Sequence, residues 1–179
     1  MRTPHPLICA TATTVTTAAA AAMTAVTVAL PAMPAGAAAA TGSEPVPVKM
    51  LRNVHTGHCL SHVHDGGTVG LDCDSNAGQH WEATGPADAQ TFKNVSSGQC
   101  LSHYARDNRT AGQDCNGGTS QQWKVTGPAG ARTLKNVYTG QCLSHPARTG
   151  YTWGKNCNGG RWQRWSLLRL PRTRASSAP

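Results

Sequence analysis

The sequence predicts an all-β fold in which three homologous units of about 42 residues close around a shared axis, each holding one internal disulfide. Three observations predict this fold. A block of twelve residues occurs three times, each copy ends in a Gln-x-Trp motif, and six cysteines follow the first forty residues. A repeat of this kind carries more weight than local propensities, so it organises the rest of the interpretation.

Composition agrees with a small, loop-rich β-protein. Of the 179 residues only 13% are charged, and there are 19 Gly, 11 Pro and 5 Trp but a single Phe. A helical bundle or coiled coil would need more Leu, Glu and Lys. Regularly spaced Trp and Cys argue against a disordered chain, and the length is too short for a catalytic domain plus a binding module.

The first forty residues are expected to be a signal peptide. Arg2 precedes an uncharged stretch over 7–30, and small residues allow cleavage between residues 37 and 41. Seven Thr within 7–30 make the stretch too polar for a membrane span. We therefore expect a secreted, extracellular protein with no membrane anchor after cleavage and a net charge of +7, since Arg2 and no acid is lost from the formal +8.

The repeats define the domain boundaries. The expected segments are a linker over 41–47, a domain over 48–170 with units 49–90, 91–132 and 133–170, and a disordered tail over 171–179. Apolar runs separated by Gly, Asn and Asp turns indicate short antiparallel strands. One unit has too few apolar residues for a core, so all three are expected to pool theirs around the axis: Leu51, Val54, Leu60 and Trp81, with Phe92, Val95, Leu101 and Trp123, and Leu134, Val137, Leu143 and Trp165.

The threefold equivalence also favours one disulfide pattern. Six cysteines allow fifteen pairings. Equivalence of the units favours Cys59–Cys73, Cys100–Cys115 and Cys142–Cys157. Each bridge closes a loop of about 15 residues and would contribute about 3 kcal/mol. A zinc site is the alternative, but no pair of cysteines has the close spacing such sites use, and export favours oxidation. No metal or cofactor is expected.

Gly-x-Cys-Leu, a second Cys and the closing Gln-x-Trp resemble the ricin-B-type β-trefoil lectins over residues 48–168, and Cys-Asn-Gly-Gly in two units resembles the actinohivin type within that family. The resemblance implies a β-trefoil with one shallow sugar pocket per unit. It also implies that the Trp residues of the closing motifs are structural core: Trp81, Trp123 and Trp165.

The sequence departs from the family pattern at the sugar-binding Asp. That position holds Ser61, Ser102 and Ser144, which lack the charge that strengthens hydrogen bonds to hydroxyls. The following residues are His62, His103 and His145. Either these imidazoles replace the Asp as polar partners, or they are duplicated turn residues with no ligand.

Unit three differs from the others at the stacking positions that the resemblance implies. Units one and two have Val69 with Gly78 and Ala111 with Ser120, whereas unit three has Trp153 with Trp162. An aromatic wall suits the apolar face of a sugar. The expected carbohydrate-binding residues are therefore Ser144, His145, Trp153, Asn158 and Trp162. The alternative is that Trp162 packs beside Trp165 and Trp153 covers the disulfide.

Charge is distributed unevenly among the units. Unit one has a net charge of −3, unit two +3, and unit three with residues up to 174 has +8. This gradient favours an anionic glycan or cell-wall polysaccharide as partner. Nucleic acid would satisfy the same electrostatics, but export argues against it. A metal could be considered at His55, His58, His62 and His64, but these flank Cys59 and need not converge.

No pattern of residues supports catalysis. The sequence has no nucleophile elbow, no phosphate loop, no pair of carboxylates at catalytic spacing and no free cysteine after cleavage. We therefore expect a non-enzymatic, secreted carbohydrate-binding protein that binds glycan mainly through unit three. The alternative is a secreted trefoil that binds or inhibits a protein partner after its sugar sites decayed.

Overall fold

A computed structural model describes residues 46–146 and 150–170. The expected signal peptide, residues 41–45 of the linker and the tail over 171–179 lie outside the described residues. No helix in the described part is long and apolar enough to cross a membrane.

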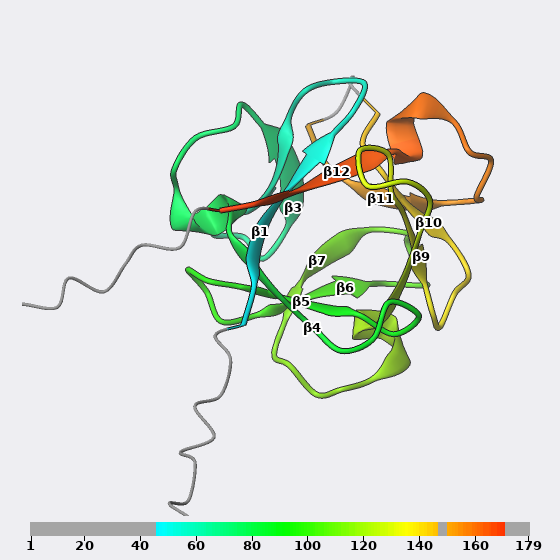
Figure 1. The fold of residues 1–179 in the computed structure, drawn as a ribbon. Coiled ribbons are helices and arrows are strands. Elements are labelled where there is room, and N and C mark those ends of the chain that lie inside the picture. Colours follow the sequence, from blue (N-terminus) through cyan, green and yellow to red (C-terminus); the bar gives the residue numbers. More distant parts are fainter. Residues whose placement is uncertain (1–45, 147–149, 171–179) are drawn as a thin grey trace, which may run out of the picture. The chain divides into compact units, whose positions relative to one another are not determined.

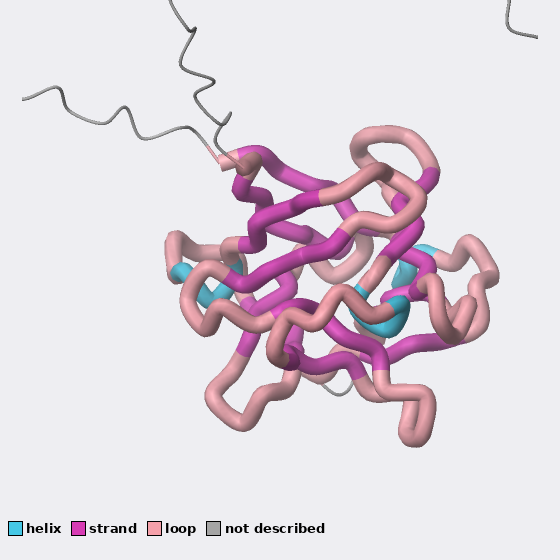
Figure 2. The backbone as a smooth tube through the Cα atoms, turned by 90° about the horizontal axis from the view of Figure 1, so that it is seen from below, coloured by secondary structure: helices cyan, strands magenta, loops and turns pink. Residues whose placement is uncertain are grey.

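Each unit contributes four short strands and one turn of 3-10 helix (Figures 1 and 2). Unit one consists of β1 (Val48–Asn53), β2 (Cys59–His62), β3 (Thr68–Leu71), η1 (Ala77–Gln79) and β4 (Trp81–Thr84). Unit two consists of β5 (Thr91–Asn94), β6 (Cys100–His103), β7 (Thr110–Gln113), η2 (Thr119–Gln121) and β8 (Trp123–Thr126). Unit three consists of β9 (Thr133–Asn136), β10 (Cys142–Ser144), β11 (Trp153–Lys155), η3 (Arg161–Gln163) and β12 (Trp165–Arg169).

The first and last strands of the units close a six-stranded barrel. β4 pairs with β5, β8 with β9 and β12 with β1, so each unit joins the next through antiparallel strands. Within the units the ring is completed by the β1–β4 pairing and by bridges from Gln90 to Trp123 and from Arg132 to Trp165. Three hairpins, β2–β3, β6–β7 and β10–β11, follow the other ends of the first strands. The predicted all-β trefoil of three units is confirmed.

The core contains the apolar residues that the three units share. Trp81, Trp123 and Trp165 are fully buried, and each indole N–H donates to a backbone carbonyl in the hairpin of its own unit at 2.9–3.0 Å. Leu and Phe side chains from all three units surround them. Burial of each such Leu or Phe side chain contributes roughly 1.5–3 kcal/mol.

The prediction for three core valines was wrong. Val54, Val95 and Val137 are 50%, 44% and 41% exposed. Each follows the last residue of the first strand of its unit, where the chain turns towards the hairpin. The side chain at this position therefore faces solvent.

Three threonines meet where the hairpins converge. The hydroxyls of Thr68, Thr110 and Thr152 lie 2.7–2.8 Å from one another, and all three residues are 0% exposed. Their equivalent positions in the units place this triangle on the pseudo-threefold axis. Each buried hydroxyl thereby has a hydrogen-bond partner, as buried polar groups require.

Buried asparagines join neighbouring units. The side-chain amides of Asn53, Asn94 and Asn136 donate to the carbonyls of Trp162, Gly78 and Ser120 at 2.8–2.9 Å. Each carbonyl belongs to the preceding unit around the axis. The three disulfides stay within units, Cys59–Cys73, Cys100–Cys115 and Cys142–Cys157, which confirms the predicted pairing.

Candidate functional site

Units one and three carry pockets at equivalent positions. The unit-three pocket measures about 520 Å³, and its lining includes Ser144, Pro146, Lys155, Asn156, Asn158 and Trp162. The unit-one pocket measures about 590 Å³, and its lining includes Ser61, His62, His64, Asp74, Asn76 and Ser97. The two share a backbone framework, but the side chains that they present differ.

The Gln of the closing motif builds the wall of each pocket. Gln163 donates from Nε2 to the carbonyl of Asn156 at 2.9 Å and accepts the Asn158 N–H through Oε1 at 3.0 Å. Gln79 makes the matching bonds around Asp74 in unit one. These buried amides hold the loop that follows the second cysteine. The side-chain amide groups of Gln79 and Gln163 are therefore engaged in hydrogen bonds that stabilise the fold.

Asn158 and Asp74 occupy equivalent positions on this loop. In each, Oδ1 accepts a backbone N–H two residues on, at 2.8 Å: Gly160 in unit three and Asn76 in unit one. This local turn orients both side chains, which are exposed at the pocket. The pocket of unit one thus presents a carboxylate where that of unit three presents an amide.

Trp162 forms part of the wall of the unit-three pocket. Its indole meets the His55 ring edge-on, with centroids 4.2 Å apart and planes at 89°. The Arg161 guanidinium lies 5.2 Å from the indole centroid. The Trp162 carbonyl accepts hydrogen bonds from Asn53 and from the His145 N–H. The backbone of Trp162 is therefore held by unit one and by its own unit, while the partly exposed indole borders the pocket.

His145, expected at the site, is instead buried between units. It is 1% exposed, its Nδ1 lies 3.0 Å from the Thr56 hydroxyl, and its ring lies where a Cβ on Gly70 would stand. Burial, followed by the charge of nearby His58, lowers the pKa of His145. Since its ring packs against unit one, it cannot also contact a glycan at the surface, and we remove it from the candidate site.

The equivalent histidines show which part of this arrangement is general. His103 is 2% exposed, contacts Thr139 at 2.9 Å and packs over Gly154 of unit three. His62 packs over Gly112 of unit two but remains partly exposed and lines the unit-one pocket. All three imidazoles therefore pack against the next unit; His103 and His145 are buried there as joints between units, and only His62 also borders a pocket.

The five expected residues of unit three do not all meet. Ser144, Asn158 and Trp162 line one pocket. Trp153 lies in β11 opposite Ser144 and bridges to Arg109 through its backbone, but it is not among the pocket-lining residues. Trp153 is therefore the direct strand neighbour of Ser144 but is not part of the lining that Ser144 shares with Asn158 and Trp162, and His145 is buried away from it.

Several lining residues were not anticipated from the sequence. Lys155, Pro146 and Asn108 all border the unit-three pocket. Asn108 comes from unit two and has a left-handed backbone with φ of 60°. The sequence signal for Lys155 was its place two residues after Trp153, on the same face of one strand. Nothing in the pattern of unit three pointed to a contribution from unit two.

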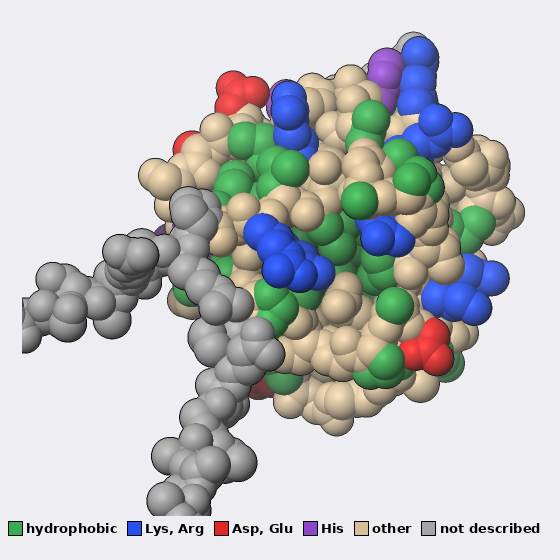
Figure 3. All heavy atoms as spheres, viewed as in Figure 1, with side chains coloured by type: hydrophobic (Ala, Val, Ile, Leu, Met, Phe, Trp, Pro, Cys, Tyr) green, Lys and Arg blue, Asp and Glu red, His purple; other side chains and the backbone are tan. Residues whose placement is uncertain are grey.

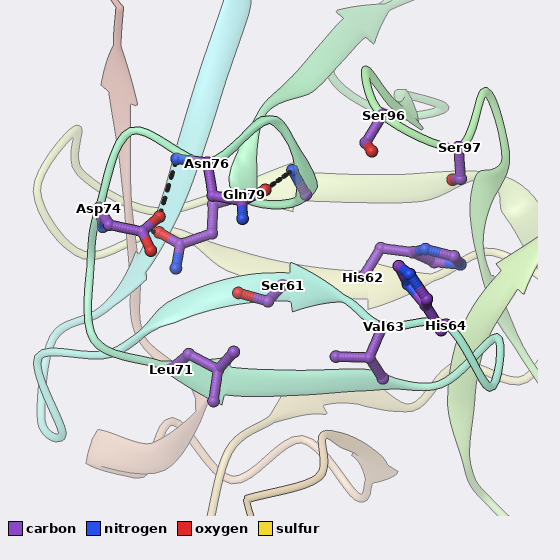
Figure 4. Close-up of a pocket in the computed structure, with 11 residues that line it drawn as sticks. Ser61, His62, Val63, His64, Leu71, Asp74, Asn76, Gln79, Ser96 and Ser97 are labelled. Carbon is purple, nitrogen blue, oxygen red and sulfur yellow. Dashed lines mark hydrogen bonds between the residues drawn. The ribbon is translucent and has the colours of Figure 1, made fainter.

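The serines in place of the family Asp have different surroundings. The Ser102 hydroxyl donates to Gln113 at 2.9 Å. The Ser61 hydroxyl is buried and has no hydrogen-bond partner among the described residues. In Figure 4, Ser61 lies between Asp74, Asn76 and Gln79 on one side and His62, His64, Ser96 and Ser97 on the other. An unsatisfied hydroxyl at this place is a polar group that a bound ligand or water can satisfy.

The four histidines of unit one do not converge. His55 contacts Trp162, His58 lies 3.5 Å from an Asp72 carboxylate oxygen, and His62 and His64 line the unit-one pocket. Over residues 46–146 and 150–170, no group of three or more His, Cys, Asp or Glu is placed to hold a metal ion.

Comparison with known proteins identifies the domain. A sequence model of the ricin-type β-trefoil lectin domain matches residues 47–165. No curated protein sequence matches the chain. The fold is similar to that of the designed threefold-symmetric protein ThreeFoil, with a TM-score of 0.64, 17% identity, and coverage of 69% of this chain and 99% of that one.

Two larger proteins contain the same fold. The GlcNAcα1-4Gal-releasing endo-β-galactosidase of Clostridium perfringens is similar with a TM-score of 0.64 and 16% identity over 70% of this chain. The Polyporus squamosus lectin, solved with the epitope Neu5Acα2-6Galβ1-4GlcNAc, is similar with a TM-score of 0.61 and 18% identity over 71% of this chain. The chain spans 33% of the first protein and 50% of the second, so the likeness concerns one domain of each.

Proposed function

The chain belongs to the ricin-type β-trefoil lectin family, and from this membership we propose that it is a secreted glycan-binding protein whose main site is the pocket of unit three. The proposed contacts are the Trp162 indole, the amides of Asn156 and Asn158, the Ser144 hydroxyl and the Lys155 ammonium group.

The observation that carries the proposal is the position of Trp162. A sugar ring has an apolar C–H face and a rim of hydroxyls, so it binds best between a flat apolar wall and fixed polar groups. In unit three the partly exposed indole and the amides of Asn156 and Asn158 line the same pocket. Unit one has Gly78 in place of the indole.

The charge of the pocket defines the class of glycan that we propose. Lys155 is an exposed cation in the lining, and none of the described residues that line this pocket is acidic. An anionic glycan or cell-wall polysaccharide would gain from attraction to Lys155. Two features favour a binding module over an enzyme: the family membership, and a proposed pocket whose described lining has no pair of carboxylates.

A glycan array tests the site with two matched variants. Trp162→Ser introduces the residue that unit two has at this position, Ser120, whose carbonyl accepts the same kind of Asn hydrogen bond. Its fold should therefore be retained, while glycan affinity falls at least about tenfold through loss of the aromatic wall. Trp153→Ala introduces the residue of unit two, Ala111, and serves as the control that should bind like the parent protein.

Three results would contradict parts of this proposal. Unchanged binding by Trp162→Ser would place the glycan elsewhere, and loss of binding only in Trp153→Ala would return Trp153 to the site. A parent protein that binds no glycan, but captures from culture supernatant a protein that free sugar does not release, would favour the protein-binding alternative.

A further inference from the structure

The end of the barrel where β1 begins and β12 ends carries a third pocket, distinct from the glycan pockets. It measures about 350 Å³. Its polar lining consists of Lys49, Gln90, Arg132 and Arg169, and its apolar lining includes Val125 and Leu167. The hairpins with the glycan pockets follow the opposite ends of the first strands, so the two kinds of pocket belong to different ends of the molecule.

The four polar residues lie on rows that point into the barrel. Alternate residues of a strand share a face. Three of the four polar residues stand two positions before a fully buried core residue: Lys49 before Leu51, Gln90 before Phe92 and Arg132 before Leu134. Arg169 stands two positions after Leu167, which packs against the core, and four after buried Trp165. Their side chains therefore continue the inward rows and cover the open end of the core.

The pseudo-threefold symmetry brings these side chains around one axis. Lys49, Gln90 and Arg132 are equivalent residues of the three units, and they bridge to Trp81, Trp123 and Trp165 respectively. Arg169 is the direct antiparallel partner of Lys49. On the face drawn in Figure 3, Lys and Arg side chains flank apolar side chains near the centre, whereas acidic side chains lie towards the rim.

The cations of this pocket are not neutralised within the described residues. The ion pairs found there join His58 to Asp72, Lys93 to Glu82 and Arg109 to Asp107, and none involves the axial pocket. Asp88, close in sequence to Gln90, lines a different pocket with Lys124 and Lys135. Burial, followed by the charges of Arg169 and Arg132, lowers the pKa of Lys49. Like charges held together beside apolar surface repel one another, and a bound anion would relieve that repulsion.

We propose that this axial pocket binds a tetrahedral oxyanion, the phosphate or sulfate group of a small molecule or of an acidic polysaccharide. The guanidinium group of Arg169 can form two parallel N–H···O bonds with such a group, and Arg132, whose Nη1 donates to the Gly127 carbonyl, can offer its Nε and Nη2. Lys49 adds a third charge and the Gln90 amide a neutral donor. The apolar floor of Val125 and Leu167 limits solvent screening, so these contacts are stronger than on an open surface. The site is independent of the glycan pocket, and either proposal can fail without the other.

Calorimetric titration of the full mature chain with sodium phosphate and sodium sulfate tests the site, with sodium chloride of equal ionic strength as the reference. We expect saturable binding of one anion per chain that chloride does not reproduce. Lys49→Gln and Arg132→Gln introduce the residue that unit two already has at the equivalent position, Gln90. Each should weaken binding about tenfold or more, since each removes a charged contact.

Arg106→Gln is the matched control, because Arg106 is an exposed cation outside the pocket. It should leave binding unchanged. The thermal midpoint, measured for the parent and for Arg132→Gln with and without phosphate, gives a second readout. Phosphate should raise the midpoint of the parent more than that of the variant. Absence of saturable binding in the parent, or equal weakening by Arg106→Gln, would overturn the proposal.

The source of the oxyanion is tested with a polymer. If a polysaccharide presents the oxyanion, Arg132→Gln should weaken the binding of dextran sulfate and should leave the binding of uncharged dextran unchanged. If inorganic sulfate binds and the polymer does not depend on Arg132, the pocket selects a small free anion.

Discussion

The pockets of units one and three share a backbone and differ in chemistry. In both, a buried Gln holds the loop after the second cysteine, and a short Asx turn orients the residue that enters the pocket. Unit one presents Asp74 with imidazoles and serine hydroxyls, whereas unit three presents Trp162, Lys155 and amides. The comparison shows that the residues that hold the shared backbone of the units and the residues that the pockets present to a ligand are separate sets.

The reason for this separation lies in which atoms the fold uses. At Gly78, Ser120 and Trp162, the contact that all three units share is made by the backbone carbonyl, which accepts the buried Asn amide of the next unit. At Asp74 and Asn158 the fold uses one side-chain oxygen, which both residues have. The other side-chain atoms at these positions take no part in the contacts that the units share, and they differ between the units.

The largest expected effect tests whether the disulfides of units one and three stabilise their units equally. Replacing both cysteines by serine in unit one (Cys59 and Cys73) or in unit three (Cys142 and Cys157) should each lower the free energy of unfolding by about 3 kcal/mol. The two losses should agree, because the sequence separations are 14 and 15 residues. Urea denaturation under non-reducing conditions measures both. A disagreement of more than about 1 kcal/mol would show unequal scaffolds, since such a difference exceeds ordinary error in extrapolation.

A smaller effect on stability should distinguish the contact between Gly70 and His145 from the equivalent contact between Gly112 and His62. Gly70→Ala would place a methyl group against the buried His145 ring, and Gly112→Ala would place one against His62. We expect Gly70→Ala to lower the free energy of unfolding by about 1–3 kcal/mol through overpacking. Gly112→Ala should lower it less, because His62 is partly exposed and has more room to move. Denaturation of both variants checks the order, and the reverse order would contradict the assignment of His145 as a rigid joint.

Acid should weaken the junctions that hold buried histidines. The pKa values of His145 and His103 are lowered, mainly by burial, so the unfolded chain binds protons that the folded chain does not. Stability is therefore complete above the unfolded value of about 6.5 and falls as pH drops below it, by at most about 1.4 kcal/mol per pH unit for each group. Unfolding midpoints at pH 7.5 and pH 5 measure this loss. His145→Gln should show a shallower pH dependence than the parent, and an unchanged slope would exclude His145 as its source.

The smallest effect on stability is expected where the pockets differ most in charge. Asp74→Asn gives unit one the residue of unit three, and the amide oxygen can accept the same backbone N–H. The free energy of unfolding should change by less than about 0.5 kcal/mol. Preference for anionic over neutral glycans on an array is the informative readout, because the substitution removes the exposed carboxylate from the unit-one pocket. A marked loss of stability would mean that the carboxylate charge itself supports the loop.

Much of the architecture could be predicted because the threefold repeat converts a sequence pattern into a spatial one. Equivalent cysteines pair within units because the hairpin of each unit brings them together, and both the pairing and the all-β trefoil agree with the prediction. Ser144, Asn158 and Trp162 line one pocket because all three lie within the hairpin and loop of unit three, and their role in glycan binding stays a prediction.

The predicted site was incomplete wherever one unit meets another. His145 follows Ser144 directly in the sequence, yet its ring contacts Thr56, 89 residues away. Asn108 reaches the unit-three pocket from unit two. Neither contact follows from the spacing of residues within a unit, because each depends on how far the neighbouring units approach when the barrel closes.

By itself, the amino-acid sequence determined three equivalent β-units, their internal disulfides and the tryptophans that they share, since these follow from local pattern and repetition. The tertiary structure alone decided that two histidines act as joints and that Lys49, Arg132 and Arg169 gather around one axis. The physical reason is that closure of the barrel brings together residues from different units, whose distances are set by the register between strands and not by their separation along the chain.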